Sequence, residues 1–344
     1  MTDVLVLSDE AISKLISLEQ TIYLIEAGFA ADASGGAVAL PVVVKSLAVF
    51  EAQFGIKAGY IHVSQWFNSP SPLLTYLCNN VGNVLGLKAG GYWQRNRSAG
   101  LPGHRAVILL LDPLTGSLLA IMSANVVTEL RTAAAGAVAA KYLARSNSEV
   151  AAVIGAGEQA HAQLKALRLV RNIRQAYVWA RRPEAAQVFA SAWKDSDVEV
   201  QVAINVRDAT QHADVVITAT NSTHALLSKE LIRPGTHITA VGSDAKGKQE
   251  LDVWLLKQAK VVVDNRNQSL EIGELQHVSS QGMDADSMVY AELGELCTGA
   301  KLGRENDQEI TVFDSSGVSF QDLVVAGYLQ RRARLGVEGQ YISL

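Results

Sequence analysis

The second half of the chain alternates short apolar runs with stretches of helical periodicity. The apolar runs have the length of buried strands, and the helix-like stretches fill the sequence between them. This order predicts a parallel sheet whose strands are joined by crossover helices. The strands are expected at residues 150–154, 176–180, 213–220, 237–241 and 260–264.

The first part of the chain follows a different pattern. Ser8-Asp9-Glu10 precedes an amphipathic stretch typical of capped helices, and Gly35-Gly36 ends it. Residues 112–116, Asp-Pro-Leu-Thr-Gly, carry Pro and Gly where a turn needs them. We therefore predict two antiparallel strands within residues 105–122 and an α+β character for this part.

Two longer helices complete the pattern. The alanine-rich segment 128–145 contains Gly136 as its one helix-breaking residue and leads directly into the first apolar run. Segment 318–336 predicts a helix with an apolar face and with Arg331, Arg332 and Arg334 near its C-terminal end.

The turn after the first predicted strand, Gly155-Ala156-Gly157-Glu158-Gln159-Ala160, has the spacing of a dinucleotide-binding turn. Gly155 permits a tight turn, Gly157 lets backbone N–H groups approach a pyrophosphate, and Ala160 allows close packing of helix on strand. Glycine turns without a ligand are also common in α/β proteins. The strand and helix alternation downstream favours the cofactor interpretation.

These patterns predict an α/β chain in two domains. We expect a Rossmann domain with a doubly wound parallel sheet at residues 130–312. Residues 1–129 and 313–344 are expected to form a discontinuous α+β domain, because the Rossmann pattern begins only near residue 130.

Composition excludes several classes of protein. The chain has 344 residues, 49% of them hydrophobic, and a net charge of −4, which is typical of a globular protein with substantial cores. It shows neither a membrane-length apolar run nor a signal-peptide pattern, so we expect a cytoplasmic protein without a membrane partner. Cys78, Cys297 and the scattered histidines suggest no metal site, and no basic run suggests a nucleic-acid partner.

Charge is nevertheless distributed unevenly. Residues 52–111 contain no Asp or Glu. The same stretch carries Lys57, Lys88, Arg95, Arg97, Arg105, His62 and His104. A locally cationic region of this kind indicates a site for an anionic small molecule.

Several motifs, in order along most of the chain, resemble the ornithine cyclodeaminase/mu-crystallin family. They are Gly86-Leu87-Lys88, Asn96 with Gly100-Leu101-Pro102, residues 112–116, Leu130-Arg131-Thr132-Ala133-Ala134, the 155–160 turn and residues 242–252. Within the family, residues 85–93, 243–252, Ile272-Gly273-Glu274 with Gln276-His277, and Gly317 with Phe320-Gln321-Asp322-Leu323 look most like the iminosuccinate reductase branch.

The resemblance implies a homodimer whose discontinuous domain binds a small amino or imino acid and forms the dimer. The Rossmann domain would hold a nicotinamide cofactor for hydride transfer at an α-carbon. The resemblance assigns Lys88 to the substrate carboxylate and Asp244 to acid/base chemistry. It assigns to the cofactor Arg131, Thr132, Gly155, Gly157, Glu158, Gln159, Thr220, Val241, Gly242, Ser243 and Lys248.

The chemistry of a 2-imino acid agrees with the two central assignments. Its carboxylate needs a cation, which Lys88 supplies, and its C=N needs a proton donor. Asp244 follows a predicted strand at the ligand-binding edge, where partial burial would raise its pKa. Alternatively, Lys88 is a solvated surface lysine, Asp244 caps a turn, and His104, a further candidate for substrate binding, is a structural histidine.

Two features bear on cofactor binding. Arg131 lies in the first turns of its predicted helix, where a cation opposes the helix dipole unless a phosphate or an acid pairs with it. The strand at 176–180 ends in Arg181-Arg182 instead of the acid that binds a ribose 2′-OH, so we expect NADP(H) rather than NAD(H). Alternatively, the two arginines only solvate a loop.

Departures from the family pattern bear on the substrate. Lys57 stands where cyclodeaminases need an acid for the distal ammonium, and Val44 stands where an arginine is expected. Gly103 replaces a hydroxyl residue, and residues 65–80 look like an insertion. A cation at Lys57 repels ornithine and attracts a second carboxylate.

The sequence therefore predicts an NAD(P)H-dependent reductase of a small, anionic 2-imino acid such as iminosuccinate, which in reverse would be an amino-acid dehydrogenase. Two alternatives stay open. One is an ornithine cyclodeaminase that forms proline and ammonia. The other is a mu-crystallin-like protein that binds NADP without turnover.

Overall fold

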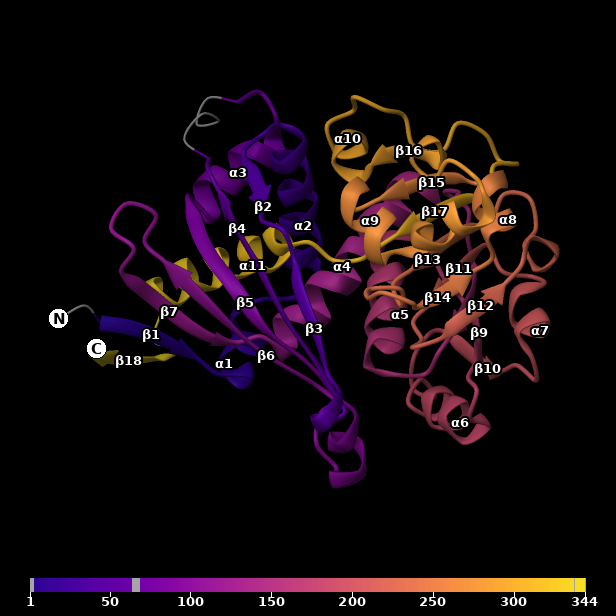
Figure 1. Ribbon diagram of the computed structural model, residues 1–344, viewed down its shortest axis with the longest axis horizontal. Helices are drawn as coiled ribbons and strands as arrows, with labels where there is room; N and C mark the ends of the chain where they lie inside the picture. Colours follow the sequence, from indigo (N-terminus) through magenta and orange to yellow (C-terminus); the bar gives the residue numbers. More distant parts are fainter. Residues whose placement is uncertain (1–2, 64–68, 337, 344) are drawn as a thin grey trace. The chain divides into compact units, whose positions relative to one another are not determined.

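The computed structural model describes residues 3–63, 69–336 and 338–343. The chain forms two compact units (Figure 1), unit 1 with Met1–Arg131 and Val318–Leu344 and unit 2 with Thr132–Gly317. The division differs from the predicted boundaries at 129/130 and 312/313. The first boundary falls inside helix α4 (Asn125–Leu143). The second follows strand β17 (Thr311–Asp314), which the predicted boundary would have cut in two.

Unit 1 is built on an eight-stranded sheet in the order β18-β1-β7-β6-β5-β4-β2, with β3 also paired to β4. β1 and β18 pair, so segments from the two ends of the chain lie side by side (Figure 1). The strands are β1 (Asp3–Leu7), β2 (Ala37–Ala39), β3 (Val43–Leu47), β4 (Ala52–Ile61), β5 (Val84–Trp93), β6 (His104–Leu111), β7 (Leu118–Ser123) and β18 (Gln340–Ser343). The predicted antiparallel pair is β6 and β7.

The helices of unit 1 begin where the sequence predicts caps. Ser8 and Ser17 accept hydrogen bonds from the first turns of α1 (Asp9–Leu15) and α2 (Leu18–Ala33). The predicted insertion at 65–80 contains α3 (Pro72–Asn80), while residues 64–68 lie outside the described part. The C-terminal helix is α11 (Ser319–Leu335).

Helix α11 packs against one face of the sheet. A Cβ at Gly59 would lie 2.6 Å from Ser319 Oγ, and one at Gly86 would lie 3.0 Å from Leu323, so glycine at both positions lets the helix approach closely. Residues 319–329 are all buried. The sequence predicted an apolar face; the structure corrects this to a helix that is buried on every side along most of its length.

The other face of this sheet is apolar and half-exposed. Ala58, Leu87, Leu109 and Ile121 form one row across β4, β5, β6 and β7. All four are only partly buried, whereas their neighbours on the α11 face, such as Ile108, are fully buried. Sheet faces of this character are usually covered by another layer of protein.

Unit 2 contains an all-parallel eight-stranded sheet in the order β10-β9-β8-β11-β13-β17-β15-β16. The strands are β8 (Val150–Ile154), β9 (Gln175–Trp179), β10 (Glu199–Val202), β11 (Val215–Thr218), β13 (His237–Ala240), β15 (Lys260–Val263), β16 (Val289–Glu292) and β17. The helices are α5 (Glu158–Val170), α6 (Pro183–Ser191), α7 (Val206–Thr210), α8 (Val253–Gln258), α9 (Arg266–Ile272) and α10 (Leu293–Cys297). A small parallel pair consists of β12 (Thr223–Leu227) and β14 (Gln249–Leu251).

This sheet confirms the doubly wound α/β prediction. From β8 the chain winds outward through β9 and β10, then returns to place β11 on the other side of β8. The crevice between the carboxyl ends of β8 and β11 is therefore the topological switch point, where ligands bind in such sheets. None of the described helices is both long enough and apolar enough to cross a bilayer.

Candidate active site

Two lysines lie directly opposite each other on the central strands of unit 1. Lys57 on β4 pairs with Lys88 on β5 in the antiparallel register, so both side chains leave the same face of the sheet. Like charges opposite each other destabilise a sheet unless an anion separates or bridges them. This pair therefore needs a negatively charged partner.

Helix α11 supplies one such partner. Asp322 Oδ1 accepts a hydrogen bond from Lys88 Nζ at 2.7 Å and lies 3.3 Å from Arg131 Nε. Lys88 Nζ also donates to Thr128 Oγ1 at 3.3 Å, and Arg131 donates to Gln321 Oε1 at 2.7 Å. We call Lys57, Lys88, Arg131 and Asp322 the cationic cluster, since Lys88 and Arg131 contact Asp322 and the charge of Lys57 acts on both Lys88 and Asp322.

The proton affinities in this cluster follow from burial and from that shared charge. Burial and the nearby charge of Arg131 lower the pKa of Lys88 to about 7, although Asp322 opposes the shift. Burial alone would raise the pKa of Asp322, but Lys88 and Arg131 bring it below its usual value. The carboxylate therefore stays ionised, and Lys88 is the member that can gain or lose a proton near neutral pH.

The replacement Asp322→Asn is expected to destabilise the fold, because it leaves two buried cations without their counter-charge. Breaking a buried ion pair from one side costs about 3–5 kcal/mol of unfolding free energy. Urea unfolding followed by circular dichroism measures this loss. Asp197→Asn, which breaks the exposed pair with Arg168, is the matched control with an expected change of about 0–1 kcal/mol. Equal effects of the two replacements would contradict a structural role for the cluster.

Two further predicted site residues of unit 1 are His104 and Arg131. His104 pairs with Tyr92, and its side chain leaves the same face of the sheet as Lys88. It stands four residues along β6 from Ile108, which pairs with Lys88, so the two positions on β6 are about 13 Å apart. Arg131 is the seventh residue of α4, not a first-turn residue, and its buried guanidinium pairs with Asp322. Within unit 1 this cation therefore has an acid partner.

In unit 2 the predicted glycine turn connects β8 to α5. Gly155 adopts φ +119°, and a Cβ there would lie 2.5 Å from the Ala219 carbonyl oxygen. Gly157 is the N-cap of the 13-residue helix α5, with open space where a Cβ would stand. Gln159 Oε1 is buried and has no hydrogen-bond partner among the described residues. An open helix N-terminus with such a side chain fits a pyrophosphate.

The loops after β11 and β13 carry the other predicted cofactor residues of this edge. Thr220 N and Gly242 N both donate to the buried carboxylate of Glu250, at 2.7 and 2.8 Å. Val241 N donates to the Thr218 carbonyl of the neighbouring strand at 3.0 Å. Ser243 is buried, and its hydroxyl donates to the Lys248 carbonyl oxygen, so this side chain shapes the loop.

Asp244 lies in the same loop but is not buried as expected. Its side chain is 52% exposed, and Oδ1 accepts a hydrogen bond from Lys248 Nζ at 2.6 Å. Lys248 Nζ also donates to Asn221 Oδ1 at 3.2 Å, which joins the loop after β13 to the loop after β11. The structure therefore replaces the expected burial with an accessible carboxylate held by a lysine.

Three other predicted residues border this edge. Arg181 and Arg182 follow β9 and are exposed, and neither forms an ion pair within the described part of the chain. The Thr132 carbonyl oxygen accepts a hydrogen bond from Gln163 of α5 at 2.9 Å, so it contacts the helix that follows the glycine turn. The residues at the β8, β9, β11 and β13 ends together fit a dinucleotide.

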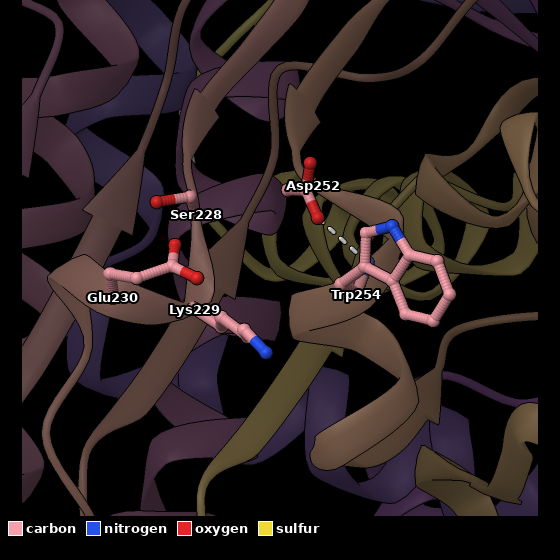
Figure 2. A pocket seen from close by; sticks show the side chains of 5 residues that line it. All are labelled: Ser228, Lys229, Glu230, Asp252 and Trp254. Carbon is pink, nitrogen blue, oxygen red and sulfur yellow. Dashed lines mark hydrogen bonds between the residues drawn. The ribbon is translucent and has the colours of Figure 1, made fainter.

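A separate hollow opens on unit 2 (Figure 2). Ser228, Lys229, Glu230, Asp252 and Trp254 line it, and Asp252 Oδ1 accepts a hydrogen bond from Trp254 N at 2.7 Å. Asp252 is the N-cap of α8. The hollow contains none of the predicted site residues. Among the described residues, no group of three or more His, Cys, Asp or Glu is arranged to hold a metal ion.

Comparison with known proteins shows the family of the chain. The family model described as ornithine cyclodeaminase/mu-crystallin family matches residues 2–336. The chain belongs to this family. The resemblance predicted from the sequence is thus confirmed, and with it the expectation of an oxidoreductase family built on a Rossmann domain and a second domain.

Relatives within the family have defined activities. An iminosuccinate reductase from Paracoccus denitrificans is 37% identical over 322 residues, covering 94% of each chain. The structure of an archaeal alanine dehydrogenase dimer with bound NAD has a TM-score of 0.89 at 36% identity, with 100% of each chain covered. A Thermococcus litoralis Delta(1)-pyrroline-2-carboxylate reductase, in complex with NADH and L-proline, has a TM-score of 0.90 at 33% identity, covering 98% of this chain and 100% of that one.

Proposed function

We propose that this protein is an NAD(P)H-dependent reductase of a small 2-imino acid with a second carboxylate, such as iminosuccinate, and that it forms the L-amino acid. The observation that carries the proposal is the cationic cluster, in which Lys57 lies opposite Lys88 and the Asp322 carboxylate contacts both Lys88 and Arg131. Three basic side chains gathered at one place favour an anion with more than one carboxylate.

The cluster assigns distinct tasks to its members. Lys88 binds the substrate carboxylate while its ammonium is protonated, and Asp322 holds that ammonium in place. Lys57 offers a cation to a second carboxylate. Arg131, predicted to bind cofactor phosphates, is proposed to take part in carboxylate binding, because its guanidinium shares Asp322 with Lys88. His104 contributes hydrogen bonding farther along the same face.

The carboxyl edge of the unit 2 sheet holds the cofactor. Gly155, Gly157, Glu158, Gln159 and Thr132 hold the pyrophosphate, while Thr220, Val241, Gly242, Ser243 and Lys248 form the rest of the groove. A bound nicotinamide supplies the hydride that makes the new C–H bond. As the C=N bond becomes a single bond, its nitrogen takes a proton, and we assign Asp244 to donate or direct it.

We further propose a preference for NADP(H). Arg181 and Arg182 are exposed at the end of β9 and are available to a 2′-phosphate. The double variant Arg181→Ala/Arg182→Ala is expected to weaken NADPH binding about tenfold or more and NADH binding about twofold or less. Titration of the reduced cofactors by fluorescence measures both. A wild-type protein that strongly prefers NADH would contradict this proposal.

The half-exposed apolar face of the unit 1 sheet is proposed to bind a second copy of the chain. Its row of Ala58, Leu87, Leu109 and Ile121 offers a continuous apolar surface, and a structural neighbour is described as a dimer. Light scattering is expected to give twice the chain mass of 36.8 kDa. A monomer at micromolar concentration would contradict this assembly.

Substrate charge tests the proposed specificity. The reductase should oxidise NAD(P)H faster with oxaloacetate and ammonia than with pyruvate and ammonia, because only the first pair offers two carboxylates. An equal rate with both pairs would still be consistent with an imine reductase, but it would contradict the role of Lys57 in binding a second carboxylate. The alternative activity, ornithine to proline without net cofactor consumption, is assayed in parallel.

A further inference from the structure

Glu250 is a fully buried acid on β14, outside the residues that the family resemblance assigns to the cofactor. Its carboxylate accepts three hydrogen bonds. Oε2 accepts from Thr218 Oγ1 at 2.6 Å and from Gly242 N at 2.8 Å, and Oε1 accepts from Thr220 N at 2.7 Å. One side chain thus connects the carboxyl end of β11 with that of β13.

Steric contacts carry this connection to the glycine turn. A Cβ at Gly242 would lie 2.4 Å from Glu250 Cδ, so only glycine accommodates the carboxylate at this distance. A Cβ at Gly155 would lie 2.5 Å from the carbonyl oxygen of Ala219, the residue before Thr220. The loop held by Glu250 therefore packs directly on the turn that is proposed to bind the pyrophosphate.

The backbone of Glu250 is itself fixed by other buried acids. Glu250 N and Leu251 N donate to the Glu274 carboxylate, each at 2.9 Å, and Glu274 N donates to Asp314 Oδ2 at 2.9 Å. Asp314 Oδ2 also accepts from Ser269 Oγ. Burial raises the pKa of Glu274 well above its usual value, and Glu250 and Asp314 add to that shift.

Burying several carboxylates together is costly, and an apolar core would be the more stable solution. A purely structural cluster does not require that Glu250 connect the two loops that are proposed to bind the cofactor. We infer that Glu250 is a positioning residue for the dinucleotide, because it sets the spacing between the Thr220 loop and the loop that carries Gly242 and Asp244. This inference rests on the proposed cofactor site.

The test compares cofactor affinity with fold stability. Glu250→Gln keeps the shape but turns one acceptor into a donor, so either Thr220 N or Gly242 N faces another N–H. We expect the variant to bind NADPH and NADH about tenfold more weakly than the wild-type protein. Fluorescence titration without substrate, at a temperature where the variant is folded, measures both affinities. Emission of the bound nicotinamide should move toward that of free cofactor.

Glu26→Gln is the matched control, because Glu26 is a buried glutamate of unit 1. It is expected to lower the melting temperature yet leave cofactor affinity within about twofold. If Glu250→Gln does not fold, Thr218→Val removes one of the three donors without changing shape and is expected to weaken binding about threefold.

The outcomes separate the two proposals. If the wild-type protein binds cofactor and a folded Glu250→Gln variant binds it equally well, the positioning role is overturned. If Glu250→Gln does not fold, the same result with Thr218→Val overturns it. A wild-type protein that binds neither NADPH nor NADH would overturn the proposed function, and this inference with it.

Discussion

Replacing Asp244 with asparagine is expected to lower kcat for imine reduction by about 10²–10⁴, because an amide cannot transfer the proton that the imine nitrogen needs. Cofactor affinity should stay within about twofold, since Asn still accepts a hydrogen bond from Lys248 in place of the present carboxylate contact at 2.6 Å. Steady-state rates together with fluorescence titration of NADPH separate the two effects.

Asp197→Asn is the control for this replacement. Asp197 is also an exposed aspartate of unit 2 in an ion pair, with Arg168 at 2.8 Å, but it lies outside the cofactor edge. It should keep full activity. A turnover number for Asp244→Asn within about threefold of the wild-type value would remove Asp244 from the proton transfer.

Replacing Lys88 with methionine is expected to lower kcat/KM by about a hundredfold or more, because the substrate carboxylate loses its buried cation. The pH dependence gives a second readout. Since the pKa of Lys88 is lowered to about 7 and the protonated ammonium binds the carboxylate, kcat/KM should fall as pH rises through about 7. The Lys88→Arg variant keeps its positive charge at every accessible pH, so its kcat/KM should not fall near pH 7.

Lys14→Met controls for the loss of one positive charge, because Lys14 is an exposed lysine paired with Glu10. It should leave both the rate and its pH profile unchanged. A decrease near pH 7 that persists in Lys88→Arg would assign the ionisation to another group. A Lys88→Met variant with unchanged KM would contradict the carboxylate-binding role.

Much of the fold follows from the sequence alone. The strands of unit 2 that lie in the middle of the sheet are short apolar runs next to strong turn signals, and β8, β9, β11, β13 and β15 lie within two residues of their predicted positions. Strand β17 was not predicted. Its Thr-Val-Phe-Asp sequence is too short to be distinguished from a loop, and it is a strand because β13 and β15 pair with it from both sides.

Residues of the proposed site could be named from the sequence where one residue carries a local signal. Lys88 stands in an apolar, glycine-rich run, and Asp244 follows a predicted strand. Asp322 and Glu250 were not among the predicted site residues. Lys88, the partner of Asp322, lies 234 residues away along the chain, and Thr218 and Thr220, two of the partners of Glu250, lie 32 and 30 residues away. One signal for Asp322 was available, since it is the one charged residue in the first eleven residues of α11, and a charge in such a largely apolar stretch needs a buried partner.

The most direct test of the account is the stoichiometry of one reaction. Purified protein with NADPH or NADH, oxaloacetate and ammonia should form L-aspartate, with one reduced cofactor oxidised for each molecule of product. The same protein should produce no proline from ornithine with NAD. Proline formation from ornithine without net cofactor consumption, together with no cofactor oxidation by any 2-oxo acid and ammonia, would contradict the imino-acid reductase.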